Sequence, residues 1–124
     1  MSAARQTFGR LGEAIAARWL EARGWRVLDR RYRVGHRDID LVVELGDTIA
    51  FVEVKARRSN ELVDPIEAVN WKKRNELARS ASIWIDRRGG GELVYRFDVI
   101  GVLVVNGRVR IRHVENAFPS PLSG

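Results

Sequence analysis

The segment from Arg37 to Arg57 places charged side chains inside an otherwise apolar pair of strands. Two apolar runs, Leu41–Val43 and Ile49–Val52, flank a turn at residues 44–47. Strands that are apolar at successive positions are usually buried on both faces. Charges within such strands are costly unless they are paired or bound to a metal ion. The charges that interrupt this segment are Asp38, Asp40, Glu53 and Lys55.

Because side chains alternate along a strand, these charges share one side of the predicted hairpin. With the turn centred between Leu45 and Gly46, Asp38 lies opposite Glu53. Asp40 is then a diagonal neighbour of Glu53, at roughly 7–8 Å. Two carboxylates at that separation can share a hard divalent cation, and the lysine of the same strand stands beside it. A register shift of one residue would move one strand's set to the opposite face.

Asp40, the turn and the Glu53-x-Lys55 sequence resemble the PD-(D/E)XK nuclease superfamily. The longer pattern is similar to the bacterial YraN family, whose members resemble archaeal Holliday-junction resolvases. The matching pieces are Gly12-Glu13, Asp38-Ile39-Asp40-Leu41, Phe51-Val52-Glu53-Val54-Lys55, Lys72, Arg96-Phe97-Asp98-Val99 and Asn116-Ala117-Phe118. They span most of the chain, so the match is more specific than Glu-x-Lys alone. The family usually has Gly-Glu where this chain has Arg37-Asp38.

The resemblance implies an α/β fold of the restriction endonuclease type, with an αβββαβ core and a mixed central sheet flanked by helices. It implies hydrolysis of phosphodiester bonds in branched or nicked DNA, with Mg²⁺ or Mn²⁺ as cofactor. Asp40, Glu53 and Lys55 are then the catalytic residues. The implied metal ligands are Asp40, Glu53, the backbone carbonyl of Val54, and Glu13 or Asp38. From the residues alone, Glu13 is expected to be a surface glutamate at the edge of a helix face, and it is the resemblance that implies a ligand there.

Two other functions remain open. The chain can be a nuclease fold that binds nucleic acid without cutting it. It can also be a protein-interaction module in which the acids and Lys55 form a buried ion network. Cutting paired strands requires two sites, which favours a homodimer.

The charge of the chain favours a polyanionic partner. There are 22 basic and 16 acidic residues, a net charge of +6, and the only lysines are Lys55, Lys72 and Lys73. A basic excess attracts nucleic acid, although an arginine-rich composition with a solvated surface has the same charge. The absence of cysteine excludes disulfides and thiolate zinc sites. With no evident signal peptide and no apolar run as long as a membrane span, we expect a cytoplasmic protein without a membrane partner.

Basic side chains near the predicted site are candidates for phosphate contacts. They are Arg31, Arg33, Arg37, Arg57, Arg58 and Lys72. Arginines flanking Tyr32 can grip phosphates while the ring stacks on a base, but a solvated edge strand has the same pattern. Lys72 is likewise compatible with a plain surface position.

Two helices are predicted. Apolar residues at spacings of three and four over residues 3–23, at Phe8, Leu11, Ile15 and Trp19, indicate an amphipathic helix with Gly24 as its C-cap. The second begins at Asp64 as N-cap, with Pro65 and Glu67 completing the start signal, and runs to about Arg87. Its buried face includes Ile66, Val69, Leu77, Ala81 and Trp84.

The C-terminal third predicts a strand, an Asn106-Gly107 turn and a returning strand, which form a β-hairpin. On the returning strand, Arg108, Arg110 and Arg112 make a basic row, which is either a DNA surface or edge-strand charge that prevents aggregation. Asp98 matches a family position but is also typical of a buried carboxylate bonded to backbone or arginine. We expect one domain over residues 1–118 and a disordered tail over residues 119–124.

Overall fold

The computed structural model describes residues 3–58, 70–90 and 92–119. Two helices and five strands make up this part of the chain, and the α/β class expected from the sequence is confirmed. The elements are α1 (Ala3–Ala22), β1 (Arg26–Val34), β2 (Arg37–Leu45), β3 (Thr48–Arg58), α2 (Trp71–Arg88), β4 (Val94–Val105) and β5 (Arg108–Val114).

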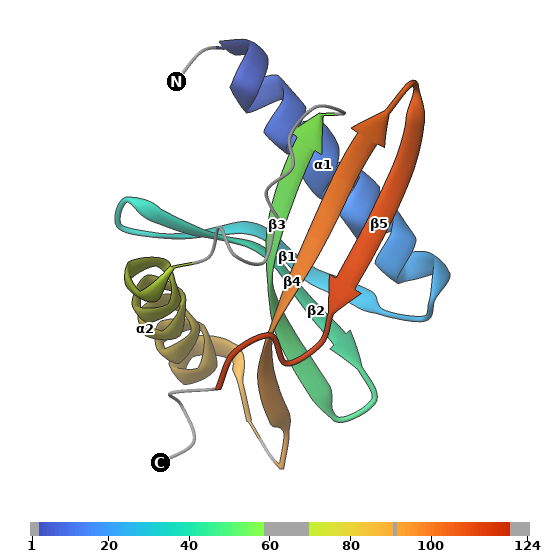
Figure 1. Cartoon of the computed structure of the whole chain (residues 1–124). Helices are drawn as coiled ribbons and strands as arrows, with labels where there is room; N and C mark the ends of the chain where they lie inside the picture. The colour runs from blue at the N-terminus through green and yellow to red at the C-terminus, as the bar shows by residue number, and fades with distance from the viewer. Residues whose placement is uncertain (1–2, 59–69, 91, 120–124) are drawn as a thin grey trace.

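The strands form one mixed sheet in the order β1-β2-β3-β4-β5. Only β3 and β4 are parallel, and the other neighbours are antiparallel. A parallel pair needs a crossover connection, which contains α2. Figure 1 shows α1 behind the sheet and α2 on the opposite side, so that the two helices cover different faces. This arrangement is compatible with a restriction endonuclease-like core.

Helix α1 lies close to the sheet through its small residues. The buried positions are Gly12, Ala16, Ala17 and Leu20, whereas Leu11 is 52% exposed. The predicted face through Phe8, Leu11, Ile15 and Trp19 is therefore wrong by about one position around the helix. Small side chains allow a closer approach to β3 than large ones, and the larger apolar residues lie at the rim. A Cβ on Gly12 would lie 2.7 Å from the Cβ of Ala56.

The end of α1 follows the sequence signal. Gly24 has φ of +94°, which favours glycine, and its N–H donates to the carbonyl of Glu21. The N–H of Trp25 donates to the carbonyl of Leu20. These two bonds are those of a Schellman motif, and they turn the chain into β1.

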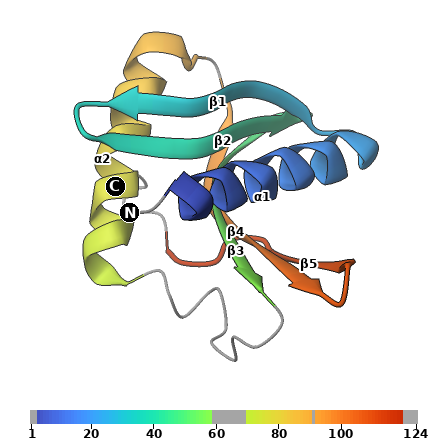
Figure 2. The ribbon, with the colours of Figure 1, turned by 90° about the horizontal axis from the view of Figure 1, so that it is seen from above.

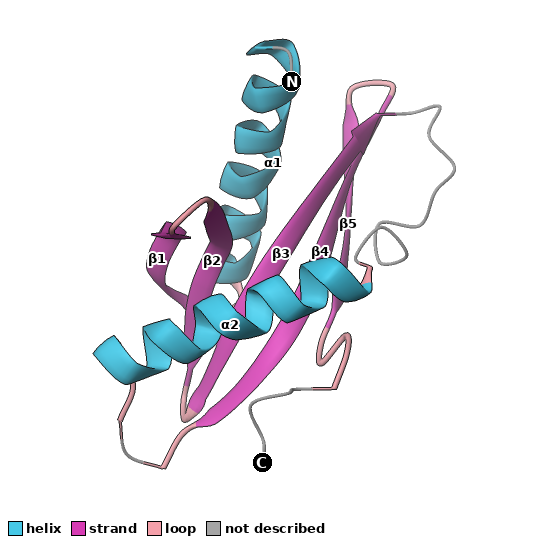
Figure 3. Cartoon of the chain, turned by 90° about the vertical axis from the view of Figure 1, so that its left-hand side faces the viewer, coloured by secondary structure: helices cyan, strands magenta, loops and turns pink. Residues whose placement is uncertain are grey.

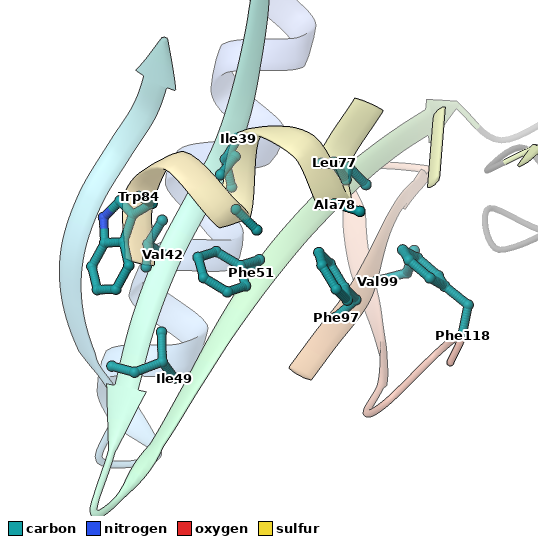
Figure 4. Packing of buried hydrophobic residues seen from close by; sticks show 11 residues of the cluster. Ile39, Val42, Ile49, Phe51, Leu77, Ala78, Trp84, Phe97, Val99 and Phe118 are labelled. Atoms are coloured by element: carbon teal, nitrogen blue, oxygen red, sulfur yellow. The ribbon is translucent and has the colours of Figure 1, made fainter. Parts of the chain in front are cut away.

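Helix α2 covers the other face through a cluster that Figure 4 shows from close by. Leu77, Ala81 and Trp84 are buried as predicted, and Trp84 meets Phe51 edge-on at 5.6 Å between ring centroids. Phe51, Phe97 and Phe118 continue the cluster across β3 and β4. In Figure 3, α2 crosses the strands at a steep angle in front of the sheet.

The start of α2 differs from the prediction. Asn70 is the N-cap, in extended backbone conformation, and its side chain accepts a hydrogen bond from the N–H of Lys73 at 3.0 Å. One uninterrupted helix from Asp64 is therefore wrong, because Asn70 is not helical. The start signal at residues 64–67, with Ile66 and Val69, lies outside the described residues. Asparagine is among the best N-cap residues.

The register of the β2–β3 hairpin also differs. Leu45 pairs with Thr48 and Leu41 with Val52, so the turn is centred on Gly46 and Asp47 rather than between Leu45 and Gly46. Gly46 has φ of +61°. The observed pairing differs from the predicted pairing by two residues, one on each strand. Because side chains alternate with a period of two, the same residues still share a face.

The C-terminal hairpin is as predicted. Asn106 and Gly107 both have positive φ, at 49° and 75°, as a type I′ turn requires. Val104 pairs with Val109 and Ile100 with His113 along the antiparallel ladder. Within the described residues, no helix is both long and apolar enough to cross a membrane.

Candidate functional site

The site lies where β2 separates from β3. The ladder between these strands runs from the turn to the Leu41–Val52 pair. Beyond it, the carboxylate of Asp40 takes the place of a strand carbonyl and accepts the N–H of Val54 at 2.8 Å. The alternation of faces breaks at this point, because Ile39 packs under α2 while Leu41 packs under α1. The resulting fork between the strands holds the polar side chains.

Glu53 lies at the centre of the fork and is almost completely buried, with 4% of its side chain exposed. Its Oε1 atom is 3.2 Å from Nζ of Lys55 on the same strand and 3.6 Å from Nζ of Lys73 on α2. Its Oε2 atom is buried and has no hydrogen-bond partner in the described part of the chain. An unpartnered buried carboxylate oxygen is rare and costly. Glu53 therefore has a free ligand atom directed into the site.

The three residues assigned to catalysis come together in this fork. Asp40 lies next to Val54 by its hydrogen bond, and Glu53 and Lys55 lie on either side of Val54. Burial raises the pKa of Asp40 well above its ordinary value, and the negative charge of Glu53 raises it further. The Val54 N–H lowers this pKa, which limits the effect. A buried and a half-buried carboxylate that repel each other are an environment that a divalent cation would stabilise.

Two further acids lie on the α1 side of the fork. Burial raises the pKa of Glu13, the positive charge of Arg31 lowers it, and Glu53 and Asp38 raise it. Arg31 has φ of 45° and lies with Nε 3.4 Å from Oε1 of Glu13. The Oδ1 atom of Asp38 is buried and lacks a hydrogen-bond partner among the described residues.

The expectation that all four hairpin charges project from one side is wrong for Asp38. Its neighbour Ile39 packs under α2, so Asp38 faces the α1 side, whereas Glu53 faces Lys73 of α2. The cause is the bend of β2 at Asp40, which a strictly alternating strand does not have.

The donor set fits a hard cation with few protein ligands. Among the described residues, no group of three or more histidine, aspartate or glutamate side chains is arranged to hold a metal ion. Asp40 and Glu53 offer two carboxylates, and the fork brings the backbone of Val54 beside them. Mg²⁺ is commonly bound through one or two carboxylates and retains several waters. The residues present therefore fit Mg²⁺ or Mn²⁺, with Glu13 and Asp38 nearby as auxiliary acids.

A groove of about 450 Å³ lies between α2 and the tip of the β1–β2 hairpin. Two residues predicted to bind nucleic acid, Arg37 and Lys72, line it together with Arg79. Arg37 is held by Glu76, with 2.8 Å between Nη2 and Oε1. Lys72 precedes Lys73 along α2, and Arg37 precedes Asp38 along β2. Its remaining lining residues are Val34, Asn75, Glu76 and Ser80.

Arg57 and Arg58 leave β3 at the end of the Glu-x-Lys strand. Nη1 of Arg57 donates to the carbonyl of Ala56 at 2.9 Å. The guanidinium of Arg58 lies over the ring of Phe8, 4.2 Å from its centroid. Both side chains thus have defined positions at the α1 end of β3.

The arginines of β1 divide between two environments. Arg31 faces the fork as a partner of Glu13, which makes it a counter-charge of the acids. Arg33 is exposed, and its Nε donates to the carbonyl of Gly35 at the hairpin tip.

Lys73 is the site residue that sequence reasoning missed. The family pattern pointed to Lys72, which is exposed, whereas Lys73 faces Glu53. The helical phase contains the signal: Lys73 precedes Leu77 by four residues and Trp84 by eleven, so all three lie on the buried face of α2.

Asp98 lies apart from the fork and has the structural role that the sequence left open. Its buried carboxylate accepts from Arg96, with Nε to Oδ1 at 3.0 Å, and from the N–H of Asn116 at 2.9 Å. Nε2 of His113 is 2.7 Å from its Oδ2. The carboxylate therefore joins β4, β5 and the segment that follows β5.

Comparison with other proteins gives one consistent result. Residues 12–102 match the model of a family described as "Uncharacterised protein family UPF0102". A UPF0102 protein of Anaeromyxobacter dehalogenans is 41% identical over 92% of this chain and 85% of its own length. One from Alkaliphilus metalliredigens is 42% identical over 91% of this chain and 98% of its own. One from Pelotomaculum thermopropionicum is 42% identical over 95% of this chain and all of its own length.

Proposed function

This chain belongs to the UPF0102 family, and we propose that it is a Mg²⁺- or Mn²⁺-dependent endonuclease that hydrolyses phosphodiester bonds in branched or nicked DNA. The proposal includes membership of the PD-(D/E)XK nuclease superfamily, which the motifs Asp40 and Glu53-x-Lys55 resemble. One observation carries it: Glu53 is buried with a free carboxylate oxygen, in a fork where Asp40 and Lys55 are its neighbours.

Each residue has a defined task in this proposal. Asp40 and Glu53 would hold the cation, with the Val54 carbonyl, and Glu13 or Asp38 would supplement them. Bound there, the ion would supply the acidification of a water molecule and the neutralisation of charge on the phosphate. Lys55 donates hydrogen bonds to that water or to the phosphate oxygens, which stabilises the negative charge of the transition state. The Val54 N–H fixes the carboxylate of Asp40 before substrate binds.

Lys73 adds a second ammonium group to the same carboxylate. In the absence of a cation, Lys55 and Lys73 compensate the charge of Glu53. When a divalent cation occupies the carboxylates, the two ammonium groups are free to contact phosphate oxygens. Lys73 is thus both a counter-charge and a candidate for holding the leaving strand.

The basic residues of the groove favour a substrate that the protein recognises through its phosphate backbone. Arg37, Lys72 and Arg79 line the groove between α2 and the tip of the β1–β2 hairpin. Contacts to phosphates position a duplex without reading its sequence. A substrate recognised by its shape, such as a junction, flap or nick, therefore fits better than a fixed base sequence. Cutting both strands of a junction would use two copies of the chain, and we propose a homodimer on the substrate.

The decisive experiment is incubation of junction, flap, nicked and linear duplex DNA with Mg²⁺ or Mn²⁺. We expect cleavage of the structured substrates and its loss in Asp40→Asn, Glu53→Gln and Lys55→Ala. Asp86→Asn is the matched control, because Asp86 is an exposed acid on α2. Cleavage that persists in all three site variants would contradict the assignment.

The observation that Glu53 is paired with two lysines also favours a second function, nucleic-acid binding without cleavage. Calorimetric titration with Mn²⁺ separates the two, since a nuclease centre binds the ion through Asp40 and Glu53. Binding of Mn²⁺ by the wild type that is absent in Asp40→Asn supports the nuclease. DNA binding without any Mn²⁺ binding supports the alternative.

A further inference from the structure

The row of arginines on β5 lies on the same face of the sheet as the candidate centre. Lys55 pairs with Gly101 of β4, and Gly101 pairs with Arg112 of β5. Paired residues on neighbouring strands share a face, so Lys55 and Arg112 project from the same side. Arg110 and Arg108 follow at every second residue and therefore project from that side too.

The clusters of buried residues confirm this assignment of faces. Phe97 and Val99 of β4, which have the parity of Gly101, belong to the cluster under α2. Ile100 and Val102, which have the opposite parity, belong to the cluster under α1, and Ile111 of β5 packs against it. The apolar residues of β5 thus face α1, and its arginines face the side on which Glu53 meets Lys73.

Helix α2 does not cover this part of the face. It packs against β1, β2 and Phe51 of β3, and Figures 1 and 2 show the β4–β5 hairpin extending away from it. Arg108, Arg110 and Arg112 are all exposed. Among the described residues, Arg108 and Arg110 form no ion pair with an acid. Exposed cations in a row on one face attract a polyanion.

We propose that Arg108, Arg110 and Arg112 bind the phosphodiester backbone of a duplex arm on one side of the candidate centre. β5 lies two strands from β3, which is roughly 10 Å at the usual strand spacing. Arg108 lies four residues along β5 from Arg112, roughly 14 Å at the usual rise. At about 3.4 Å per nucleotide step, the row reaches about four nucleotides from the phosphate held beside Lys55.

This inference depends on the proposed function only for the position of the reacting phosphate. DNA binding is therefore measured without divalent cations, by fluorescence anisotropy with a nicked duplex at several salt concentrations. The test variant is Arg108→Gln with Arg110→Gln. The matched control is Arg18→Gln with Arg26→Gln, which removes the same charge from exposed positions on α1 and β1.

We expect the test variant to bind about tenfold more weakly at about 0.1 M salt, because two phosphate contacts are lost. Its slope of log K against log salt should become shallower by about two, one for each arginine. The control should bind within about twofold of the wild type. Equal affinities and slopes for the test and control variants would overturn the proposal. A failure to cleave DNA does not affect these measurements.

A second measurement locates the contact. Neutral methylphosphonate links are placed three to five nucleotides from the nick, on one side or the other. On the side of the nick that contacts the arginines, the neutral links should weaken DNA binding by the wild type. They should also abolish the difference in DNA affinity between wild type and the Arg108→Gln/Arg110→Gln variant. If the arginines instead only protect the sheet edge, the variant will self-associate with unchanged DNA affinity, which overturns the proposal. Equal loss of binding to anionic lipid vesicles and to DNA would overturn it as well.

Discussion

Glu53 and Asp40 illustrate how single residues in the fork oppose the stability of the fold. Glu53 is buried with one unpaired oxygen, and Asp40 is half-buried beside it. Burial and the neighbouring carboxylate disfavour the charged form of Asp40 that a cation would require. Buried groups with perturbed pKa values gather at functional sites more often than elsewhere. The cation-free protein should therefore gain stability when the charge of Asp40 is removed.

The first prediction concerns Asp40→Asn in the cation-free protein. The folded-state pKa of Asp40 is raised above its ordinary value of 3.8. The stability that the protonated group provides is then fully present below about pH 3.8 and is lost as pH rises through the folded-state pKa. Asparagine cannot titrate and can still accept the Val54 N–H. The variant should be more stable than wild type at pH 7 by about 1 kcal/mol, or roughly 3–6 °C.

The measurement is thermal unfolding from pH 4 to pH 8 in the presence of a chelator. The difference between Asp40→Asn and wild type should grow with pH, whereas Asp86→Asn should follow wild type throughout. A difference that shrinks with rising pH would show that Asp40 is stabilised as a carboxylate.

The second prediction concerns Asp98, which has a structural rather than a chemical role. Asp98→Ala leaves Arg96 without its buried partner and the N–H of Asn116 without an acceptor. Breaking a buried pair in this way costs about 3–5 kcal/mol. Urea unfolding measures the loss. The exposed substitution Asp86→Ala should stay within about 0.5 kcal/mol of wild type. A comparable small loss for Asp98→Ala would refute the role of this carboxylate.

The elements of the fold depend on how closely α1 approaches β3. Gly12 permits this approach, because its backbone lies against Ala56 with no room for a side chain. Gly9, one turn earlier in the same helix, faces open space, and a Cβ there would meet no neighbouring atom within 4 Å. Substitutions at the two glycines therefore distinguish the effect of helix propensity on stability from the effect of packing.

The third prediction uses this pair of glycines. Gly9→Ala should stabilise the protein by up to about 1 kcal/mol, because alanine favours helix over glycine. Gly12→Ala should destabilise it by about 1–3 kcal/mol, because the new methyl group pushes α1 from the sheet. Urea unfolding of both variants tests the opposite signs. Equal stabilisation by both would mean that α1 lies further from β3.

The positions of most helices and strands could be predicted from the sequence, but the buried face of α1 could not. Apolar runs and turn residues located the strands and the hairpin at Asn106-Gly107, and the Gly24 signal located the end of α1. The face of α1 was wrong by about one position, because the small residues Gly12, Ala16 and Ala17 lie at its centre together with Leu20. A search for helical periodicity gives most weight to large apolar residues such as Leu11. It does not take into account that small residues allow a helix to approach a sheet closely.

The composition of the site was likewise predictable in part. The motif residues Asp40, Glu53 and Lys55 were identified from charge in an apolar setting, and the structure brings them together. The bend at Asp40, which turns Asp38 towards α1, has no sequence signal because alternation assumes a regular strand. Lys73 was missed although it lies on the predicted buried face with Leu77 and Trp84, because the family pattern pointed to Lys72.

At the scale of the whole molecule, one sheet carries both the apolar clusters that stabilise the fold and the polar fork of the candidate site. The cluster under α2 and the cluster under α1 bury the apolar residues on both faces. The polar fork occupies the end of the β2–β3 pair where neither cluster is continuous. A ligand that binds only the folded fork must therefore stabilise the entire chain.

The fourth prediction concerns this linkage. Mn²⁺ at about one hundred times its dissociation constant should stabilise wild type by about 2.7 kcal/mol. Thermal unfolding with and without Mn²⁺ measures the effect, and chelator should reverse it. Glu53→Gln should show no such stabilisation, while Asp86→Asn should respond as wild type does. An equal response of Glu53→Gln would place the ion elsewhere.

The parting of β2 from β3 beyond Leu41 has a mechanical consequence. Between the β2–β3 turn and Leu41, β2 has a neighbouring strand on each side. From Asp38 to the tip of the β1–β2 hairpin, its strand partner is β1. Beyond the β3 ladder, the β1–β2 tip is therefore held by α2, through Ile39 under the helix and the Arg37–Glu76 ion pair. A displacement of α2 would move this tip with it and so change the position of Asp40 relative to Glu53.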